Sequence, residues 1–215
     1  MEIKKSKEEK IEELDLKIKN CKKCNLWKTR NKPLVGDGSI HADILLIGES
    51  PGYNENLVGK AFVGEAGKIL DKLLSLINLK RDEIYITNIL KCHPPKNHNP
   101  SRQEIDSCIG YLHEQIKIIK PKIILTLGKY ASKEVFTNFN LIFTRISDFH
   151  GKIFEAETGF GKLENLFDFP NSLKSKEFQR KIKIIPLYHP AVACYHNEML
   201  DVLKEDFKKL GNVVK

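Results

Sequence analysis

Short apolar runs alternate along the chain with segments whose apolar residues recur every three or four positions. The runs cover residues 43–48, 84–89, 122–128 and 183–187, and each predicts a short strand that is buried on both faces. The periodic segments predict amphipathic helices that cover these strands. Strands that alternate with helices indicate an α/β fold, here a three-layer α/β/α sandwich with a central, mainly parallel four-stranded sheet.

Two of the predicted helices begin with the same local signal, a serine followed three residues later by a glutamate. Ser6 with Glu9 and Ser101 with Glu104 fit a capping box, in which each side chain accepts a hydrogen bond from the other residue's backbone N–H. Pro121 ends the second of these helices, because proline cannot continue helical hydrogen bonding. Further helices are predicted at residues 69–77, from residue 129 onward and at residues 198–210.

Residues 138–180 interrupt the regular alternation of strands and helices. The GFG sequence at 159–161 is typical of a turn, and the stretch that follows has no helical or strand period. The strand at 183–187 then returns to the core pattern. We interpret residues 1–215 as a single domain with a surface insertion at about 138–180.

Composition narrows the class of protein only in part. Hydrophobic residues make up 41% and charged residues 30%, which is typical of a globular protein, and the net charge is +8. A positive balance favours a polyanionic partner, because lysine and arginine neutralise phosphates. No apolar run approaches the roughly 20 residues of a membrane span, and the N-terminal segment does not resemble a signal peptide. We therefore expect a cytoplasmic protein that does not bind membranes.

Five cysteines are the first indication of specific chemistry. Cys21 and Cys24 form a C-x2-C pair, and Cys92 and Cys108 follow at a distance. Disulfides are a poor explanation in a reducing compartment, and four thiolates suit zinc or an iron–sulfur cluster. Spacing does not choose between the two, and Cys108 also fits a buried position on its helix. Cys194 has no partner nearby, and we expect it in the core or in a pocket wall.

Polar loops follow three of the predicted strands. In a sheet of this kind, ligands bind where loops leave the carboxyl ends of the strands. Residues 48–52 (GESPG) follow the first strand, Asn88 ends the second, and His189 follows the last. GESPG matches neither a P-loop nor a dinucleotide-binding motif. A tight turn, a turn cap and a satisfied histidine are the plain alternatives, but they do not explain why the three coincide.

Several of these segments together resemble one family. GESPGYNEN, GKAFVGEAGKILDKLL, YITNILKCHPP and YHPA are similar to the motifs of the family 4 uracil-DNA glycosylases, in the same order. The resemblance covers about residues 14–136 and 182–197. It implies an enzyme that removes uracil from single- or double-stranded DNA and leaves an abasic site. It also implies a monomer that is associated with the nucleoid.

The resemblance extends to a cofactor. The four cysteines match the ligands of the family's 4Fe–4S cluster, so Cys21, Cys24, Cys92 and Cys108 would hold such a cluster here. Because the implied reaction is a hydrolysis, which needs no electron transfer, we expect the cluster to be structural.

The resemblance also implies which residues bind the base. Phe62 would stack on a uracil turned out of the DNA, and the amide of Asn88 would read uracil O4 and N3. Glu55 would lie against uracil C5 and exclude the methyl group of thymine. Backbone N–H groups near Ser50 and Gly52 would bind the uracil or the neighbouring phosphate.

Two residues are implied to be catalytic. Glu49 would position or activate the attacking water, and His189 would donate a hydrogen bond to uracil O2 and stabilise the leaving anion. Taken alone, Glu49 has the plain reading of a solvated loop carboxylate, and Phe62 that of a core phenylalanine. No lysine is assigned as a Schiff-base nucleophile, so we predict no lyase activity.

The chain departs from the family's motifs at a few positions, which leaves two alternatives open. Ser50, Asn56, Ala61 and His93 replace the usual residues, and the sequence after YHPA is VACYHN. Ser50 keeps open a specificity for deaminated purines such as hypoxanthine. The basic charge and the cysteines alone would also permit a non-catalytic nucleic-acid-binding module held together by zinc or a cluster.

Overall fold

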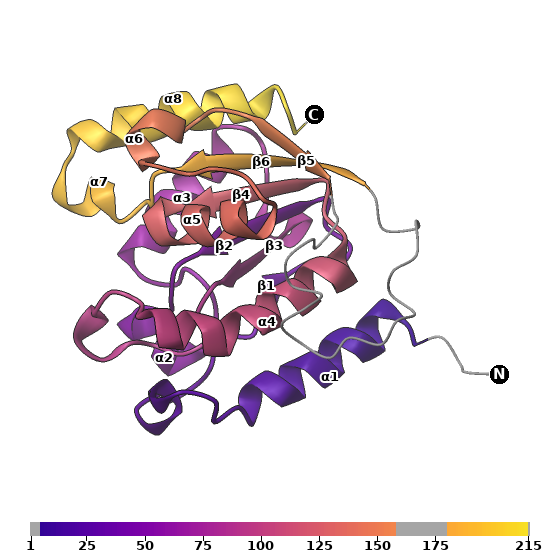
Figure 1. Cartoon of the computed structure of the whole chain (residues 1–215). Coiled ribbons are helices and arrows are strands. Elements are labelled where there is room, and N and C mark those ends of the chain that lie inside the picture. Colours follow the sequence, from indigo (N-terminus) through magenta and orange to yellow (C-terminus); the bar gives the residue numbers. More distant parts are fainter. Residues whose placement is uncertain (1–4, 158–179, 215) are drawn as a thin grey trace.

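A mixed sheet of six strands forms the centre of the molecule, in the order β1-β3-β2-β4-β6-β5 (Figure 1). The structure is a computed structural model, and it describes residues 5–157 and 180–214. The strands are β1 (Asp37–Gly38), β2 (Ile44–Gly48), β3 (Ile84–Asn88), β4 (Ile123–Leu127), β5 (Phe154–Glu157) and β6 (Lys181–Leu187). The predicted strands β2, β3, β4 and β6 are parallel neighbours in the middle of this sheet.

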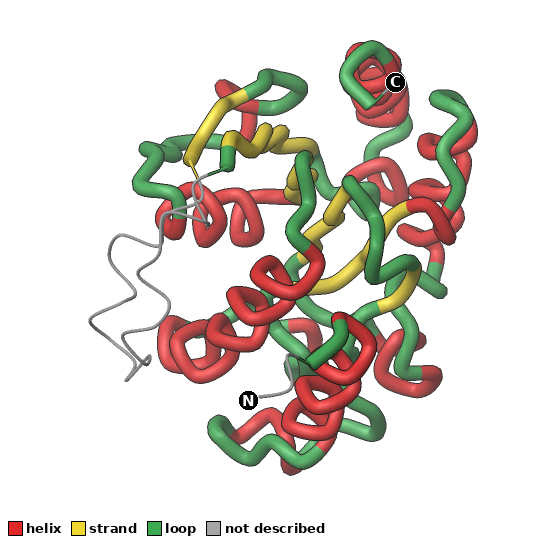
Figure 2. Tube along the Cα trace, turned by 90° about the vertical axis from the view of Figure 1, so that its right-hand side faces the viewer, coloured by secondary structure: helices red, strands yellow, loops and turns green. Residues whose placement is uncertain are grey.

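Helices cover both faces of the sheet, and the α/β/α architecture predicted from the sequence is confirmed. Figure 2 shows the strands between helices on both sides. The α-helices are α1 (Lys7–Lys19), α2 (Tyr53–Val58), α3 (Glu65–Ser75), α4 (Arg102–Ile119), α5 (Gly128–Asn138), α6 (Ile146–Phe149), α7 (Val192–Tyr195) and α8 (Glu198–Gly211). Short 3-10 helices η1 (Asn25–Lys28), η2 (Arg81–Glu83) and η3 (Pro95–Asn97) lie in the connections.

The alternation of side chains along each strand divides the core into two parts. In β2, Leu45 and Ile47 pack in a cluster with α1, α4 and α5, whereas Ile44 and Leu46 pack in a second cluster with α3 and α8. Successive side chains of a strand point to opposite faces, so a strand covered by helices on both sides must be apolar at every position. The five residues of β2 are accordingly all buried.

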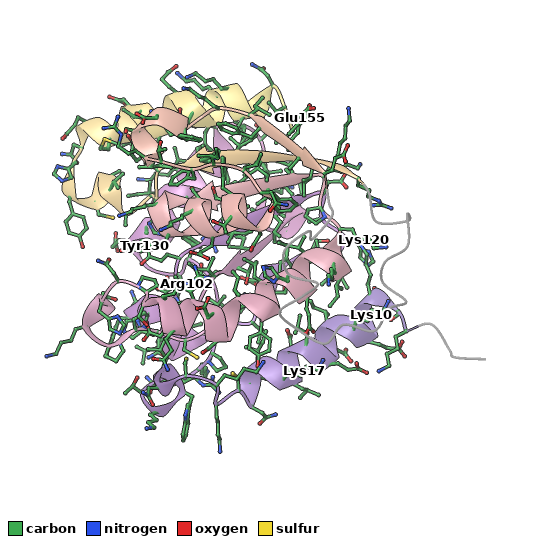
Figure 3. All side chains as sticks on the ribbon, in the orientation of Figure 1. Lys10, Lys17, Arg102, Lys120, Tyr130 and Glu155 are labelled. Atoms are coloured by element: carbon green, nitrogen blue, oxygen red, sulfur yellow. The ribbon has the colours of Figure 1, made fainter. Side chains whose placement is uncertain are left out.

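Both predicted capping boxes are present. Ser6 caps α1 and Ser101 caps α4, and in each case the side chain of the glutamate three residues later accepts from the backbone N–H of the cap residue. In α1 the apolar stripe of Ile11, Leu14 and Ile18 is buried. The labelled lysines of α1, Lys10 and Lys17, lie away from the sheet in Figure 3. Helix α1 is therefore held by one apolar face and presents charge on the other.

The two outer strands extend the predicted four-stranded centre to six strands. Strand β1 pairs antiparallel with β3, and β5 pairs antiparallel with β6. Strand β5 and helix α6 belong to the segment that we interpreted as an insertion, and Phe149 and Phe154 contact Phe136 of α5 with ring centroids 5.6 and 5.0 Å apart. The part at 138–157 thus packs on the core, and 158–179, with the GFG turn, lies outside the described residues.

Among the residues that the structure describes, no helix is long and apolar enough to cross a membrane.

Candidate active site

A pocket of about 380 Å³ opens at the carboxyl edge of the parallel strands. Its size is in the usual range for small-ligand sites, roughly 300–1,000 Å³. All of the pocket residues expected from the sequence line it, namely Glu49, Ser50, Gly52, Glu55, Phe62, Asn88 and His189. The structure therefore brings together segments that are as far apart in the sequence as residues 49 and 189.

Parallel pairing explains why these segments meet. Gly48 at the end of β2 is in register with Asn88 at the end of β3. The pairing continues past the strands, because the N–H of Leu90 donates to the carbonyl of Glu49 at 3.0 Å. A ring nitrogen of His93 lies 2.8 Å from the carbonyl oxygen of Pro51. The loop that carries Glu49 is thus held against the segment that follows Asn88.

The side chain of Asn88 is buried with a free acceptor. Within the described part of the chain, its Oδ1 is buried and has no hydrogen-bond partner. A Cβ at Gly48 would lie 2.3 Å from this Oδ1 and 3.1 Å from Cζ of Phe62, so only glycine allows the close approach. Leaving a buried acceptor unpaired costs about 1–3 kcal/mol, which favours a ligand that donates a hydrogen bond to it.

His189 follows β6 at the same carboxyl edge of the sheet, and it is held in one tautomer. Its Nδ1 accepts a hydrogen bond from the backbone N–H of Ala191 at 3.2 Å, so the ring proton lies on Nε2. Burial lowers the pKa of His189 to about 4, although the carboxylate of Glu55 acts in the opposite direction. The imidazole is therefore neutral near pH 7, with Nε2–H available as a donor.

The two glutamates of the pocket differ in what they contact. Burial raises the pKa of Glu49, and this carboxyl lies directly after β2. Glu55 instead accepts hydrogen bonds from the backbone N–H groups of Val63 and Gly64 at 2.8 and 2.9 Å. The carboxylate of Glu55 thus holds the loop that carries Phe62, whereas Glu49 has the raised pKa of a candidate base.

Phe62 forms an apolar wall of the pocket. Its ring is 5.6 Å from that of His189, with an angle of 29° between the two planes. Only 7% of Phe62 is exposed, and it packs in the same cluster as Ala61 and Leu70. The residue is therefore both a core phenylalanine, as the plain reading proposed, and a surface on which a flat ring in the pocket could stack.

A second, smaller cavity lies beside the pocket, on the side of α1 and α4. It is lined by Cys21, Cys24, Cys92 and Cys108, together with Trp27, Arg30 and Tyr111 among others. All four cysteines are free thiols. Among the described residues, no three His, Cys, Asp or Glu side chains converge in the way that a single metal ion requires. Thiolates are ligands of both zinc and iron–sulfur clusters, so the type of donor fits either group.

Hydrogen-bond donors point at two of these sulfurs. A guanidinium nitrogen of Arg30 lies 3.1 Å from Sγ of Cys92, and the backbone N–H of Lys91 donates to Sγ of Cys108 at 3.3 Å. Burial raises the pKa of the Cys92 thiol, and it raises that of Cys108 to about 12. The donor set fits thiolates that are bound to a positively charged group, because a metal stabilises a buried thiolate.

Comparison with known proteins gives the family. The family model of the uracil DNA glycosylase superfamily matches residues 35–211. The chain belongs to the uracil DNA glycosylase superfamily. A type-4 uracil-DNA glycosylase of Archaeoglobus fulgidus is 37% identical over 205 residues, which cover 95% of this chain and 94% of that protein. A type-4 uracil-DNA glycosylase of Sulfurisphaera tokodaii is 38% identical over 201 residues, which cover 93% of this chain and 83% of that protein.

More distant members of the superfamily match a smaller part of the chain. A type-5 uracil-DNA glycosylase of Pyrobaculum aerophilum is 29% identical over 133 residues, which cover 55% of this chain. The type-4 relatives are thus more similar, and over a greater length. The resemblance to family 4 that rested on four short motifs is confirmed.

The sequence did not point to several further residues that line this pocket. Pro51, Ala66, Asn97 and Ala191 also line it. Asn97 lies in η3, after Cys92, and no local pattern marks it. The expectation for Cys194 was wrong, because this cysteine is exposed. It lies in α7, a helix of 4 residues in which only Ala193 is buried, so it has no helical period from which burial could be judged.

Proposed function

We propose that this protein hydrolyses the N-glycosidic bond of deoxyuridine in DNA and leaves an abasic site. The observation that carries the proposal is one pocket that combines an unpaired amide acceptor, a neutral histidine and a carboxyl with a raised pKa. These three groups match the donors and acceptors of uracil and the charges that develop when the bond breaks.

Recognition of the base would rest on Asn88. Its free Oδ1 is an acceptor for the N3–H of uracil, and its Nδ2 is a donor for uracil O4. Cytosine has an acceptor at N3 and a donor at C4, so the same amide would oppose it at both positions. Because Asn88 is buried between Gly48 and the pocket, it cannot turn freely to suit the wrong base.

The chemical step would rest on Glu49 and His189. The bond between C1′ and uracil N1 breaks, and its electron pair leaves with the base. The Nε2–H of His189 donates to O2 of the uracil anion and stabilises its charge. A water molecule adds to C1′ and transfers its proton to the carboxylate of Glu49, which also stabilises the positive charge on the sugar.

Binding of the base would rest on Phe62 and Glu55. A uracil turned out of the DNA would stack on the ring of Phe62, which offsets part of the cost of unstacking. Glu55 would lie against C5, and its bonds to the loop at residues 63–64 would fix its position. The backbone near Ser50 and Gly52 would bind the base or the phosphate beside it.

The four cysteines would hold a 4Fe–4S cluster, which would supply a rigid crosslink between the N-terminal segment and the start of α4. The basic chain, with a net charge of +8, would bind the substrate as a monomer, on single- or double-stranded DNA. Such a substrate would place the protein at the nucleoid, within the cytoplasm.

A substrate panel tests the proposal. Purified protein is incubated with DNA that carries a single uracil, hypoxanthine, xanthine or mismatched thymine, and the released bases are separated by chromatography. We expect free uracil from single strands and from U·G duplexes, with a backbone that stays intact until alkali is added. Binding without release, release of a purine in place of uracil, or strand cutting without alkali would each contradict it.

A further inference from the structure

The backbone of Phe62 has an unfavourable conformation. Its φ angle is 52°, in the left-handed region that residues other than glycine rarely adopt. A bulky residue keeps such a conformation only where its surroundings hold it there. The ring of Phe62 lies against Gly48 and His189, so any relaxation of this backbone would move a wall of the pocket.

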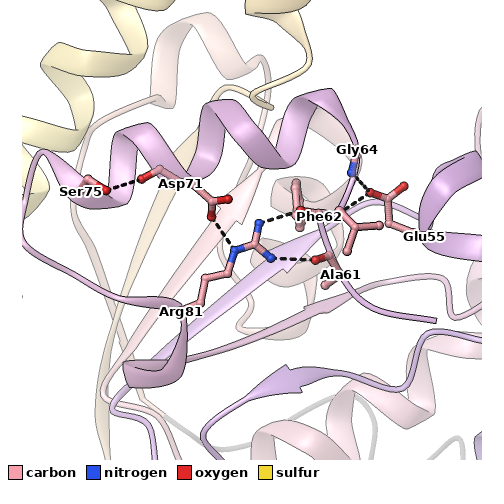
Figure 4. A network of polar contacts seen from close by, with 8 residues as sticks. Glu55, Ala61, Phe62, Gly64, Asp71, Ser75 and Arg81 are labelled. Carbon is pink, nitrogen blue, oxygen red and sulfur yellow. Dashed lines mark hydrogen bonds and ion pairs between the residues drawn. The ribbon is translucent and has the colours of Figure 1, made fainter. Parts of the chain in front are cut away.

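Arg81 holds the carbonyl groups on one side of this strained residue (Figure 4). Its Nη1 donates to the carbonyl of Ala61 at 2.9 Å, and its Nη2 donates to the carbonyl of Phe62 at 2.6 Å. Its Nε donates to Oδ1 of Asp71 on α3 at 2.5 Å. The planar guanidinium therefore fixes two successive carbonyl groups relative to α3, which the single charge of a lysine could not do.

Other contacts hold the rest of the loop. Glu55 accepts hydrogen bonds from the N–H groups of Val63 and Gly64. It lies on the opposite side of Phe62 from Arg81 (Figure 4). A Cβ at Gly67 would lie 1.7 Å from the carbonyl oxygen of Phe62, so α3 packs directly on this backbone. The loop is thus held by α2, by α3 and by Arg81 together.

We propose that Arg81 is a positioning residue that sets the place of the Phe62 ring in the base pocket. Arg81 is not one of the described residues that line the pocket, and its side chain is 30% exposed. It acts on the substrate only through the backbone of Phe62. The effect of the Phe62 ring on catalysis rests on the proposed function. The effect of Arg81 on the place of that ring does not.

A double-mutant cycle tests whether Arg81 acts through Phe62. We expect Arg81→Met to lower kcat/KM for uracil-containing DNA by roughly tenfold to a hundredfold, because a misplaced contact group weakens binding in the transition state. The loss in Arg81→Met should divide between kcat and KM in the same way as the loss in Phe62→Leu. In the Phe62→Leu background, adding Arg81→Met should change kcat/KM by less than about twofold, since coupled residues are not additive.

Matched variants separate positioning from general destabilisation. Arg145 is an exposed arginine that pairs with Asp148, so Arg145→Met should leave kcat and KM unchanged. Asp71→Asn should shift the values in the direction of Arg81→Met, but by less, because it removes only the anchor of the guanidinium. Thermal unfolding of each variant shows how much protein is folded at the assay temperature.

Fluorine NMR gives a readout that does not depend on activity. Protein labelled with fluorophenylalanine carries 11 phenylalanines, and the signal lost in Phe62→Leu identifies Phe62. We expect Arg81→Met to shift or broaden this signal, and Arg145→Met to leave it in place. An unchanged Phe62 signal, or equal losses of kcat/KM from Arg81→Met in both backgrounds, would overturn the inference. Wild-type protein that releases no uracil would overturn the proposed function, and the NMR result would still decide the role of Arg81.

Discussion

The base pocket and the cysteine cavity are joined by residues 88–93, and they differ in whether their polar atoms have hydrogen-bond partners. In the pocket, Asn88 keeps a buried acceptor that has no partner among the residues the structure describes. In the cysteine cavity, Cys92 and Cys108 already accept hydrogen bonds from Arg30 and from the backbone of Lys91. An unpaired buried acceptor suits a ligand that binds reversibly. Sulfurs that already accept hydrogen bonds suit a permanently bound group.

The side chain of Lys91 connects the two regions. It is fully buried, and its ammonium donates to Thr87 Oγ1, to the carbonyl of Asn88 and to Gln115 Oε1, each at 2.7 Å. Its backbone N–H donates to the sulfur of Cys108. The end of β3 is thus tied to α4 beside the cysteines. We expect changes in the pocket to affect the rate, and changes at the cysteines to affect stability first.

The largest effect is expected from Glu49→Gln. The amide keeps the size of the side chain but cannot accept a proton from water, so uracil release should fall by roughly 10²–10⁴-fold. Rates are measured under single-turnover conditions, and unfolding is followed by circular dichroism. The melting temperature should stay within about 2 °C of the wild type, since burial of an uncharged amide costs less than that of a carboxylate.

Glu155→Gln is the matched control. Glu155 is exposed on the edge strand β5 and pairs with Lys183 near the start of β6, whereas the pocket lies beyond the other end of that strand. The same chemical change should therefore leave the rate and the melting temperature unaltered. If Glu49→Gln retained the wild-type rate, Glu49 would not be the base, and the assignment of catalysis to the base pocket would lose its support.

A smaller effect on the rate, with a large effect on stability, is expected from Cys108→Ala. Removing one of the four proposed cluster ligands should abolish the visible absorbance that the proposed cluster would give, and lower the melting temperature by on the order of 10 °C, because metal binding contributes directly to folding. Below that temperature, uracil release should fall by only about tenfold, since the pocket side chains are intact.

Cys194→Ala is the control for this loss, because Cys194 is exposed and does not line the cysteine cavity. It should leave colour, stability and rate unchanged. A wild-type protein that is colourless and contains zinc would contradict the cluster. A Cys108→Ala variant that is as inactive as Glu49→Gln at full stability would contradict the division of roles.

The sequence predicted the centre of the fold well, for a physical reason. A strand buried on both faces must be apolar throughout, and a helix on such a sheet needs one apolar stripe. The apolar patterns around Leu45 and Leu70 therefore predict β2 and α3. The pocket followed from topology, since the carboxyl ends of parallel strands meet at one edge. The edge strands β1 and β5 were not foreseen, because short, half-exposed strands have no distinctive pattern.

Contacts to the backbone of distant segments could not be predicted, unlike the capping boxes, whose partners lie three residues apart. Arg81 donates to two carbonyl groups, and carbonyl groups are the same in every residue, so no sequence pattern marks the pairing. The free acceptor of Asn88 and the tautomer of His189 likewise depend on distances between segments. Motifs named the candidate site residues, and only the structure gave their hydrogen bonds.

The smallest effect is expected from mild acid, and it distinguishes the two pocket groups. A base works only as the carboxylate, and burial raises the pKa of Glu49, so kcat should fall with falling pH in a range above the usual carboxyl pKa. His189, with a pKa of about 4, stays neutral in that range. The logarithm of kcat should therefore fall with unit slope as Glu49 alone binds its proton, and His189 should add no second step above pH 4 because its Nε2–H donor stays in place.

The stability of the protein should respond to the same two groups with opposite signs. The pKa of His189 is lowered from 6.5 to about 4, so the unfolded chain binds more protons between these values, and the contribution of His189 to stability is lost as the pH falls through this window. Glu49 has a raised pKa, so the folded chain binds its proton first and gains stability on acidification. Urea unfolding between pH 7 and pH 4 measures both contributions. His189→Gln should make the free energy of unfolding fall less on acidification than in the wild type, and Glu49→Gln should make it fall more. Identical profiles for the two variants would show that burial in this pocket does not control either charge.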